Sequence, residues 1–290
     1  MFKPIHKKFG LVVQGGTLRS IFTAGILDAF ISAKYNPFKY MVGVSGGAMC
    51  MAYYATKQYN VTYKIMHDLA NDDQFMNWLN MFSEEGYVNL EYLDEFSQNK
   101  YPLDLSILNK KARRIKIEIV STSMKDGRPV YLRAKGDSWY KYLRASASIP
   151  FLTKGQCVID NLKLMDGGWS DPIPVKRAIE QKCTDIVVIR TQPKFHREKW
   201  SYFGVFGGYW HRNTPNLSKR FHDDYMFYNE IADFLEKEQE GVNIHQLAPP
   251  DYLKTSSYFT SSEKLDIDYR LGLDLGLNFV KKIRGKKPLI

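Results

Sequence analysis

Short apolar runs alternate with helix-like spacing of apolar residues along much of the chain. Residues 9–13 and 40–44 are apolar runs that each lead into a glycine turn, which is typical of buried strands. Each run precedes a segment with apolar residues at helical spacing, at 21–33 and at 46–57. Because strands that alternate with helices tend to pair in parallel, this pattern predicts a parallel sheet with helices on its faces.

The middle of the chain adds two hairpins. Residues 115–120 alternate between polar and apolar positions and are expected to pair with 129–132 across a Lys-Asp-Gly turn. Residues 157–159 and 163–165 form a second hairpin, which leads directly into Asp166. The other expected elements are a mostly helical region at 60–105, a helix at 175–181, a strand at 185–189, a helix at about 218–237, a strand at 242–245 and a last helix within 271–279.

One stretch, residues 199–217, has little periodicity. Its aromatic residues lie among glycines: Trp200, Tyr202, Phe203, Phe206, Tyr209 and Trp210. Trp and Tyr suit a membrane interface because one end of each is apolar and the other polar, so we expect a flap or an interfacial patch. The alternative is a loop folded onto the core. Since the chain has no internal repeat and no low-complexity linker, one domain with elaborations is the simplest organisation.

The composition is that of a globular protein with a basic surplus. Of the 290 residues, 44% are hydrophobic and 25% charged, and the formal net charge is +10. Part of the surplus lies in runs at 110–114 and 281–287. It fits an anionic partner such as anionic lipid headgroups, an acidic substrate or nucleic acid, or simply a basic surface.

Cysteine usage and hydropathy bear on the compartment. The three cysteines, Cys50, Cys157 and Cys183, are odd in number and widely spaced, which indicates neither a disulfide framework nor a metal site. There is no signal-peptide pattern, and no apolar run approaches the roughly 20 residues that span a bilayer. We therefore expect a cytoplasmic protein whose contact with a membrane is at most peripheral.

Residues 43–47 match the pattern G-x-S-x-G, with Ser45 at its centre. The serine lies between an expected strand and an expected helix, which is the arrangement of a nucleophile elbow. Gly43, Gly46 and Gly47 permit the tight turn, and the start of the helix favours negative charge on an attacked ester. The alternative is a glycine-rich turn in which the serine only caps the helix.

A second glycine turn, Gly15-Gly16-Thr17, follows the first expected strand, and its successive N–H groups can surround an anion. No Lys-Ser/Thr pair follows, and Thr17 and Ser20 stand at later glycine positions of the dinucleotide fingerprint, which disfavours a nucleotide-binding protein. Turns after adjacent parallel strands lie side by side at the carboxyl edge of the sheet. One turn can therefore carry the nucleophile and the other the oxyanion hole.

A proton acceptor for Ser45 is the third requirement. Asp166 ends the second hairpin, and Gly167 and Gly168 allow it to approach another loop closely. A carboxylate within hydrogen-bond reach of a hydroxyl can serve as general base, although the same residues also fit an ordinary Asp-Gly turn. The late histidines stand in no glycine-flanked turn and are expected to be surface or structural residues: His196, His211, His222 and His245.

Together these elements resemble the patatin-like phospholipase family, which has a glycine-rich oxyanion loop with an arginine, a G-x-S-x-G nucleophile and an Asp-Gly base, in this order. The matching residues here are Gly15, Gly16 and Arg19, then Ser45, then Asp166. The likeness continues in the segment 145–150 and in Pro172, Pro174 and Val175. It defines a catalytic domain at 8–190 and leaves 191–290 as a C-terminal elaboration of the same domain.

The resemblance implies a three-layer α/β/α fold with a mostly parallel central sheet. It implies a serine lipid acyl hydrolase with a Ser45–Asp166 dyad, an oxyanion hole at Gly15, Gly16 and Thr17, and neither metal nor other cofactor. The expected partners are a lipid ester substrate and, peripherally, an anionic membrane, but not nucleic acid. Because Thr17 and Ser20 replace glycines of the family's loop, the second hypothesis is a catalytically weak or inactive lipid-binding or regulatory protein on this fold.

Overall fold

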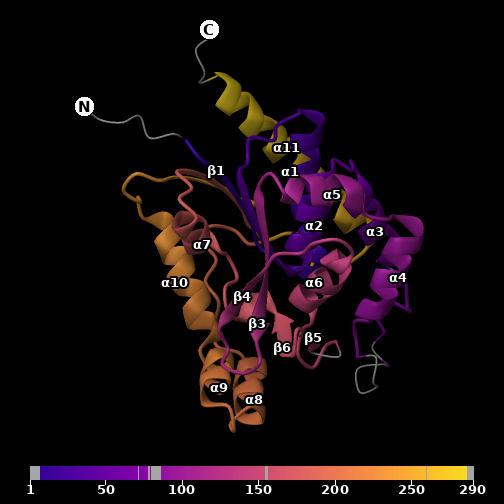
Figure 1. The fold of residues 1–290 in the computed structure, drawn as a ribbon, viewed down its shortest axis with the longest axis vertical. Coiled ribbons are helices and arrows are strands. Elements are labelled where there is room, and N and C mark those ends of the chain that lie inside the picture. The colour runs from indigo at the N-terminus through magenta and orange to yellow at the C-terminus, as the bar shows by residue number, and fades with distance from the viewer. Residues whose placement is uncertain are drawn as a thin grey trace.

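The computed structural model describes residues 7–285 except 71, 78, 80–85, 154, 155 and 259. Helices cover both faces of a central β-sheet, so the layers follow the order α/β/α (Figure 1), and the expected fold class is confirmed. The strands are β1 (Phe9–Val13), β2 (Tyr40–Val44), β3 (Lys116–Ser123), β4 (Pro129–Leu132), β5 (Cys157–Ile159), β6 (Leu162–Asp166), β7 (Asp185–Ile189) and β8 (Asn243–Leu247). The helices are α1 (Ser20–Ser32), α2 (Ser45–Thr56), α3 (Val61–Leu69), α4 (Leu90–Lys100), α5 (Leu105–Ala112), α6 (Ser138–Ala147), α7 (Val175–Glu180), α8 (Tyr202–Trp210), α9 (Pro215–His222), α10 (Asp224–Glu236) and α11 (Ser262–Gly285).

The sheet is mostly parallel. Its strand order is β5-β6-β3-β2-β1-β7-β8, and β4 pairs with β3 off this path. The neighbouring strands from β3 to β8 in this order run parallel, whereas the hairpin strands β4, β5 and β6 pair antiparallel. Because β1 and β2 are parallel neighbours, the turns that follow them emerge side by side at one edge of the sheet.

Both faces of the central strands are buried, which explains their unbroken apolar runs. Leu11 and Val13 belong to the core beneath α1, α2 and α11. Val12 points to the opposite face and packs into a second core with α7 and α10. No helix among the described residues is both long and apolar enough to cross a membrane.

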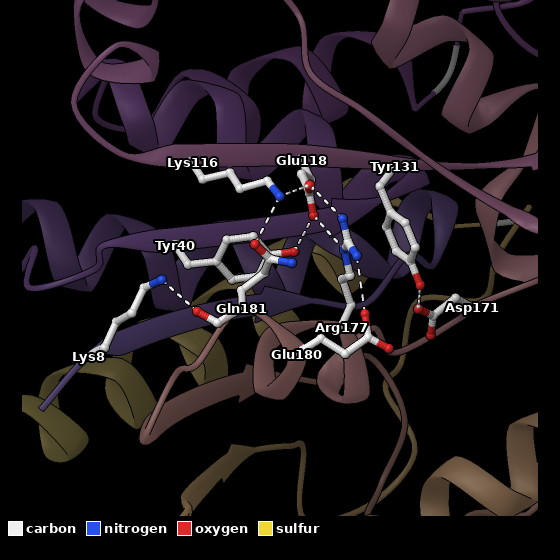
Figure 2. A network of polar contacts seen from close by, with 9 residues as sticks. All are labelled: Lys8, Tyr40, Lys116, Glu118, Tyr131, Asp171, Arg177, Glu180 and Gln181. Carbon is white, nitrogen blue, oxygen red and sulfur yellow. Dashed lines mark hydrogen bonds and ion pairs between the residues drawn. The ribbon is translucent and has the colours of Figure 1, made fainter. Parts of the chain in front are cut away.

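A buried carboxylate, Glu118 on β3, joins α7 to the sheet (Figure 2). The Arg177 guanidinium donates to its two oxygens at 2.9 and 3.0 Å, the Tyr40 hydroxyl donates at 2.5 Å, and Lys116 Nζ lies 2.7 Å away. Burial acts to raise the pKa of Glu118, but the hydrogen bonds from these three partners outweigh it and lower the pKa. Since Lys116 also donates to Gln181, the network holds the C-terminal end of α7.

The chain between β6 and α7 is held by a further contact in the same view. The Tyr131 hydroxyl donates to Asp171 at 2.8 Å, and the Arg177 guanidinium stands 4.2 Å from the centre of the Tyr131 ring (Figure 2). Burial raises the pKa of Asp171 to about 6, against the effect of this hydrogen bond. The segment that follows Asp166 is therefore fixed on the sheet.

The C-terminal third differs from the prediction in three places. Residues 199–217 were expected to lack regular structure, but they contain α8 and the start of α9, which pack against each other. The single helix expected at about 218–237 is divided at Asp223 into α9 and α10. The last helix is α11, which is much longer than the expected 271–279.

The sequence did not predict α8 because glycines, rather than large apolar residues, form the buried side of this helix. Gly204, Gly207 and Gly208 are buried, and a Cβ on Gly207 would stand 2.5 Å from the Phe221 ring of α9. Only glycine lets α9 pack this closely, so the aromatic residues of α8 lie on its other faces. The helix therefore lacks the regular spacing of aliphatic residues from which a buried helix is predicted. The basic run at 281–287 continues past residue 285, where the described part of the chain ends.

Candidate active site

Ser45 is the first residue of α2 and directly follows β2. It is 6% exposed, and its φ of +52° is a left-handed conformation that costs a non-glycine residue about 1–2 kcal/mol. Its N–H donates to Ser146 Oγ at 2.8 Å, and that hydroxyl donates in turn to the carbonyl of Val120. Strain of this kind persists where the surroundings enforce it and is common at functional sites.

Asp166 is the last residue of β6 and is likewise 6% exposed. The Gly168 N–H donates to its Oδ1 at 2.7 Å, Thr122 Oγ1 donates to its carbonyl at 2.7 Å, and its own N–H donates to the Ser148 carbonyl at 2.8 Å. Burial raises the pKa of Asp166 to about 6, while hydrogen bonds with the Ser45 side chain and the Gly168 N–H act to lower it. Above that pH the side chain is a carboxylate, which can accept a proton.

Ser45 and Asp166 line one pocket of about 270 Å³, here called the polar pocket because charged residues are among those that line it. Of the other residues selected from the sequence, those that also line it are Gly15, Gly16, Thr17, Arg19, Gly168 and Pro172. Gly46 borders a second cavity next to Ser45, and Gly43, Gly47 and Gly167 lie where a Cβ would meet the main chain of a neighbouring segment. The fold thus brings together three motifs that are far apart in the sequence.

The loop after β1 runs directly against Ser45. A Cβ on Gly15 would lie 2.9 Å from the Ser45 Cβ, so only glycine fits here. Thr191 Oγ1 fixes the loop by donating to the Gly15 carbonyl at 2.7 Å. Among the described residues, no hydrogen bond uses the N–H groups of Gly15, Gly16 or Thr17, which leaves these donors available to a ligand.

Thr17 and Ser20, which stand at glycine positions of the family's loop, differ in their conformations. Thr17 has a φ of +49°, where a β-branched residue is costly, so this change does strain the loop. Ser20 has a φ of −65° and fits without strain. The Thr17 N–H is nevertheless retained, because a backbone donor does not depend on the side chain.

Arg19 contributes a cation to the polar pocket. Its side chain lines the pocket, and within the described part of the chain its buried Nε has no hydrogen-bond partner. Burial lowers the pKa of Arg19, although the nearby charge of Glu198 acts to raise it. The guanidinium remains charged at physiological pH.

The C-terminal third supplies a wall of the pocket that the sequence did not indicate. Its contributions are Glu198, Lys199, Ser201, Asp224, Tyr225, Tyr228, Ser257 and Tyr258. Burial raises the pKa of Asp224 to about 6, against a hydrogen bond from the Tyr225 N–H. No local motif marks these residues, because they come from a loop, from α10 and from the segment before α11, and only the fold brings them to Ser45.

An apolar cavity of about 80 Å³ begins on the other side of Ser45. Three helices line it with residues at helical spacing: Met49 and Tyr53 of α2, Thr62, Ile65, Met66 and Leu69 of α3, and Leu90, Leu93 and Ser97 of α4. The described residues that line it include no charged side chain. A ligand at Ser45 therefore has a polar space on one side and an apolar space on the other.

The four late histidines lie away from Ser45, since none of them lines either space. Their contacts are with Tyr252 for His196, Phe221 for His211, Asp223 for His222 and Phe279 for His245. These contacts fit the expected surface or structural roles. Among the described residues, no group of three or more His, Cys, Asp or Glu side chains is placed to hold a metal ion.

The model of the patatin-like phospholipase family matches residues 11–179, which is more than half of the chain. The chain belongs to this family. The match contains Ser45, Asp166 and the loop after β1, and it supports a lipid acyl hydrolase at the family level. A second match, to a domain of unknown function (DUF6363), covers residues 214–285 and so includes α10, β8 and α11.

Comparison with individual proteins adds three similarities. The chain is 28% identical to the uncharacterized protein YjjU of Escherichia coli strain K12, over 97% of this chain and 81% of that protein. It is 24% identical to lysophospholipase NTE1 of Kluyveromyces lactis, over 54% of this chain and only 11% of that relative. The crystal structure of VipD from Legionella pneumophila aligns with 96% of this chain and 67% of its own, at 12% identity and a TM-score of 0.46.

Proposed function

We propose that this chain hydrolyses acyl esters of lipids, with Ser45 as the nucleophile and Asp166 as the proton acceptor. The observation that carries the proposal is the strained, buried Ser45 in one pocket with the buried carboxylate of Asp166, whose pKa burial raises to about 6 against the effect of the Ser45 side chain. Membership of a phospholipase family and similarity to a named lysophospholipase support the substrate class.

In the proposed reaction, Ser45 Oγ attacks the carbonyl carbon of the ester while its proton passes to Asp166. The negative charge that develops on the carbonyl oxygen is stabilised by the N–H groups of Gly15, Gly16 and Thr17. When the tetrahedral intermediate collapses, the alcohol leaves with the proton from Asp166, and the acyl group stays on Ser45. A water molecule then gives a proton to Asp166 as it attacks the acyl group, and the fatty acid is released as Ser45 regains its proton.

The two spaces at Ser45 support a separate place for each half of the substrate in the proposed reaction. The apolar cavity takes the acyl chain. At about 80 Å³ it is smaller than the roughly 150 Å³ cavities that hold a benzene molecule, so a long chain must displace the flexible side chains of Met49 and Met66. The polar pocket takes the alcohol part of the ester, which meets the cation of Arg19 and the carboxylates of Glu198 and Asp224.

Labelling with a fluorophosphonate probe, combined with hydrolysis of p-nitrophenyl esters, tests the nucleophile. The wild type is expected to be labelled and to turn over, and Ser45→Ala to do neither. Ser106→Ala, which removes an exposed serine on α5, is the matched control and is expected to behave as wild type. Near wild-type turnover by a clean Ser45→Ala preparation would overturn the assignment, and a folded wild type that is neither labelled nor active would favour the inactive lipid-binding alternative.

The acyl side of the proposal has its own test. Met66→Trp fills the apolar cavity, so kcat/KM for a long-chain p-nitrophenyl ester is expected to fall about 10- to 100-fold while the acetate ester is hydrolysed as before. Leu79→Trp adds the same ring at a highly exposed position and serves as the control. An equal fall for both esters would contradict the placement of the acyl chain in this cavity.

A further inference from the structure

Helix α8 presents exposed aromatic side chains to the solvent. Five residues form this surface, here called the aromatic face: Trp200, Tyr202, Phe206, Tyr209 and Trp210. Tyr202 is 83% exposed and Tyr209 65%. Large apolar groups that gather in this way on a protein surface mark an interaction site more often than single exposed residues do.

The opposite side of α8 is anchored to the fold. Gly207 packs on Phe221 of α9, and Phe203 stacks on Trp169 with ring centres 5.8 Å apart. Because these two contacts use the inner side of the helix, the aromatic face is held outward by the packing of α8 itself. At the border of this face, Phe151 packs edge-on against Phe206 and Trp210.

The chain around the aromatic face is basic. Residues 199–222 contain Lys199, Arg212, Lys219 and Arg220 but no Asp or Glu, and the stretch is bordered by Glu198 and Asp223. Lys219 pairs with Asp223, whereas Lys199 and Arg212 are exposed, and the Arg212 guanidinium lies 4.7 Å from the centre of the Tyr209 ring. Trp and Tyr flanked by Lys and Arg match a surface with an apolar interior and anionic headgroups.

The position of the aromatic face relative to the pocket points to the same partner. Lys199 and Ser201, the two neighbours of Trp200, both line the polar pocket that contains Ser45. Ser201 is also the N-cap of α8 and accepts a hydrogen bond from the Gly204 N–H. In Figure 1, α8 and α9 form one end of the molecule, opposite the start of β1 and the end of α11. A lipid surface that contacts this end therefore adjoins the pocket.

We propose that the aromatic face docks this protein on an anionic lipid bilayer, with its Trp and Tyr side chains at headgroup depth and Lys199 and Arg212 against the headgroups. The contact is reversible, because it uses side chains of a folded helix and no inserted anchor. The proposal concerns binding alone and stands independently of whether Ser45 hydrolyses an ester.

Co-sedimentation of the full chain with vesicles tests the docking. The Ser45→Ala background is used so that no lipid is consumed, and the vesicles are phosphatidylcholine with or without phosphatidylglycerol. Binding is expected for the anionic vesicles at low salt and is expected to weaken as salt shortens the Debye length. Tyr202→Ala/Tyr209→Ala is expected to weaken binding about tenfold, and Arg212→Gln about fivefold.

Two controls separate docking from a folding defect. With Ser45 intact, Tyr202→Ala/Tyr209→Ala is expected to hydrolyse a soluble p-nitrophenyl ester like wild type, since neither tyrosine lines the pocket. Tyr59→Ala/Ile107→Ala removes exposed apolar side chains elsewhere and is expected to bind vesicles like wild type. Absence of binding to anionic vesicles at low salt would overturn the proposal. Vesicle binding that Tyr202→Ala/Tyr209→Ala leaves unchanged would also overturn it. A third contrary result would be that the wild type binds no vesicles but self-associates, and that the tyrosine variant abolishes this self-association.

Discussion

The two regions of the chain contribute to the candidate site in different ways. Residues up to about 189 place Ser45, Asp166 and the loop after β1 at strand ends, where main-chain and hydroxyl contacts fix Ser45 and Asp166. The loop after β1 is fixed by Thr191 of the second region. Residues beyond 190 supply side chains from helices and a loop, such as Glu198 and Asp224, which form the outer wall of the same pocket. In the proposed function, the chemistry depends on the first region, and recognition of the ester's alcohol part depends on the second.

The largest expected effect lies in the first region. Asp166→Asn keeps the shape of the side chain but removes the proton acceptor, so kcat is expected to fall about 10³-fold or more. Because residues that act as one unit are strongly non-additive, Ser45→Ala/Asp166→Asn is expected to be little worse than either single variant. Steady-state kinetics on a p-nitrophenyl ester checks this. A comparable loss in His196→Ala, His211→Ala, His222→Ala or His245→Ala, with the fold intact, would instead indicate a histidine base.

Stability offers the second contrast between the regions. Glu118→Gln leaves Lys116 without a carboxylate partner and Arg177 with only the exposed Glu180, and it is expected to lower the free energy of unfolding by about 3–5 kcal/mol. Arg197→Ala removes exposed ion pairs with Asp233 and Glu236, and it is expected to change the free energy of unfolding by no more than about 1 kcal/mol. Urea unfolding of both variants measures the difference. Equal losses would contradict the expected difference between the buried ion pairs of the first region and the exposed ion pairs of the second.

The Glu118 contribution also has a predicted pH dependence. Its pKa is lowered in the folded state, so its stabilising effect is complete above the ordinary value of 4.5 and is lost as the pH falls through the lowered value. The stability gap between wild type and Glu118→Gln is therefore expected to narrow in acid, which urea titrations at several pH values can follow.

The pH dependence of activity distinguishes two buried carboxyls, one from each region. Both Asp166 and Asp224 have a pKa raised to about 6, mainly by burial. Because a general base must be ionised, kcat/KM is expected to fall about tenfold per pH unit below about 6. The same acid limb is expected in Asp224→Asn. If the acid limb disappeared in Asp224→Asn, the group whose ionisation limits activity would be Asp224 of the second region and not Asp166.

The smallest expected effect belongs to the outer wall. Glu198→Gln/Asp224→Asn is expected to change KM for a lysophospholipid by up to about tenfold, since the pocket retains its shape but loses two charges. The same variant is expected to hydrolyse p-nitrophenyl butyrate, which has no headgroup, with an unchanged kcat. A fall in kcat on butyrate would show that the second region also takes part in the chemistry.

Sequence reasoning placed Ser45 and Asp166 correctly at strand ends, where local pattern and burial agree, while their catalytic roles stay a prediction. Ser45 and Asp166 lie in glycine turns at strand ends, and such turns are visible without the fold. Ser146, whose hydroxyl accepts the Ser45 N–H, was part of a recognised segment but gave no sign of this role, because the contact joins residues 101 positions apart. Long-range contacts of this kind depend on strand order, which no single motif encodes.

Helices α1 and α8 show the limit of hydropathy as a guide to burial. Both are rich in apolar residues, but nearly all of α1 is buried under α2 and α11, whereas α8 buries mainly glycines and exposes its rings. An apolar pattern predicts burial when large side chains fill the core. The prediction fails when glycines let a neighbouring helix approach closely, as Gly207 lets the Phe221 ring of α9 do here.

The packing of α11 along α1 has a consequence for the order in which the protein can fold. The Tyr269 hydroxyl donates to Asp28 at 2.9 Å, across 241 positions of sequence. During synthesis on the ribosome, part of the apolar surface of α1 therefore stays exposed until almost the entire chain has emerged and α11 can pack on it. A gene fragment cut at the end of the phospholipase match would leave that surface open and encourage aggregation, so the boundary of the family model is a poor place to shorten this protein for expression.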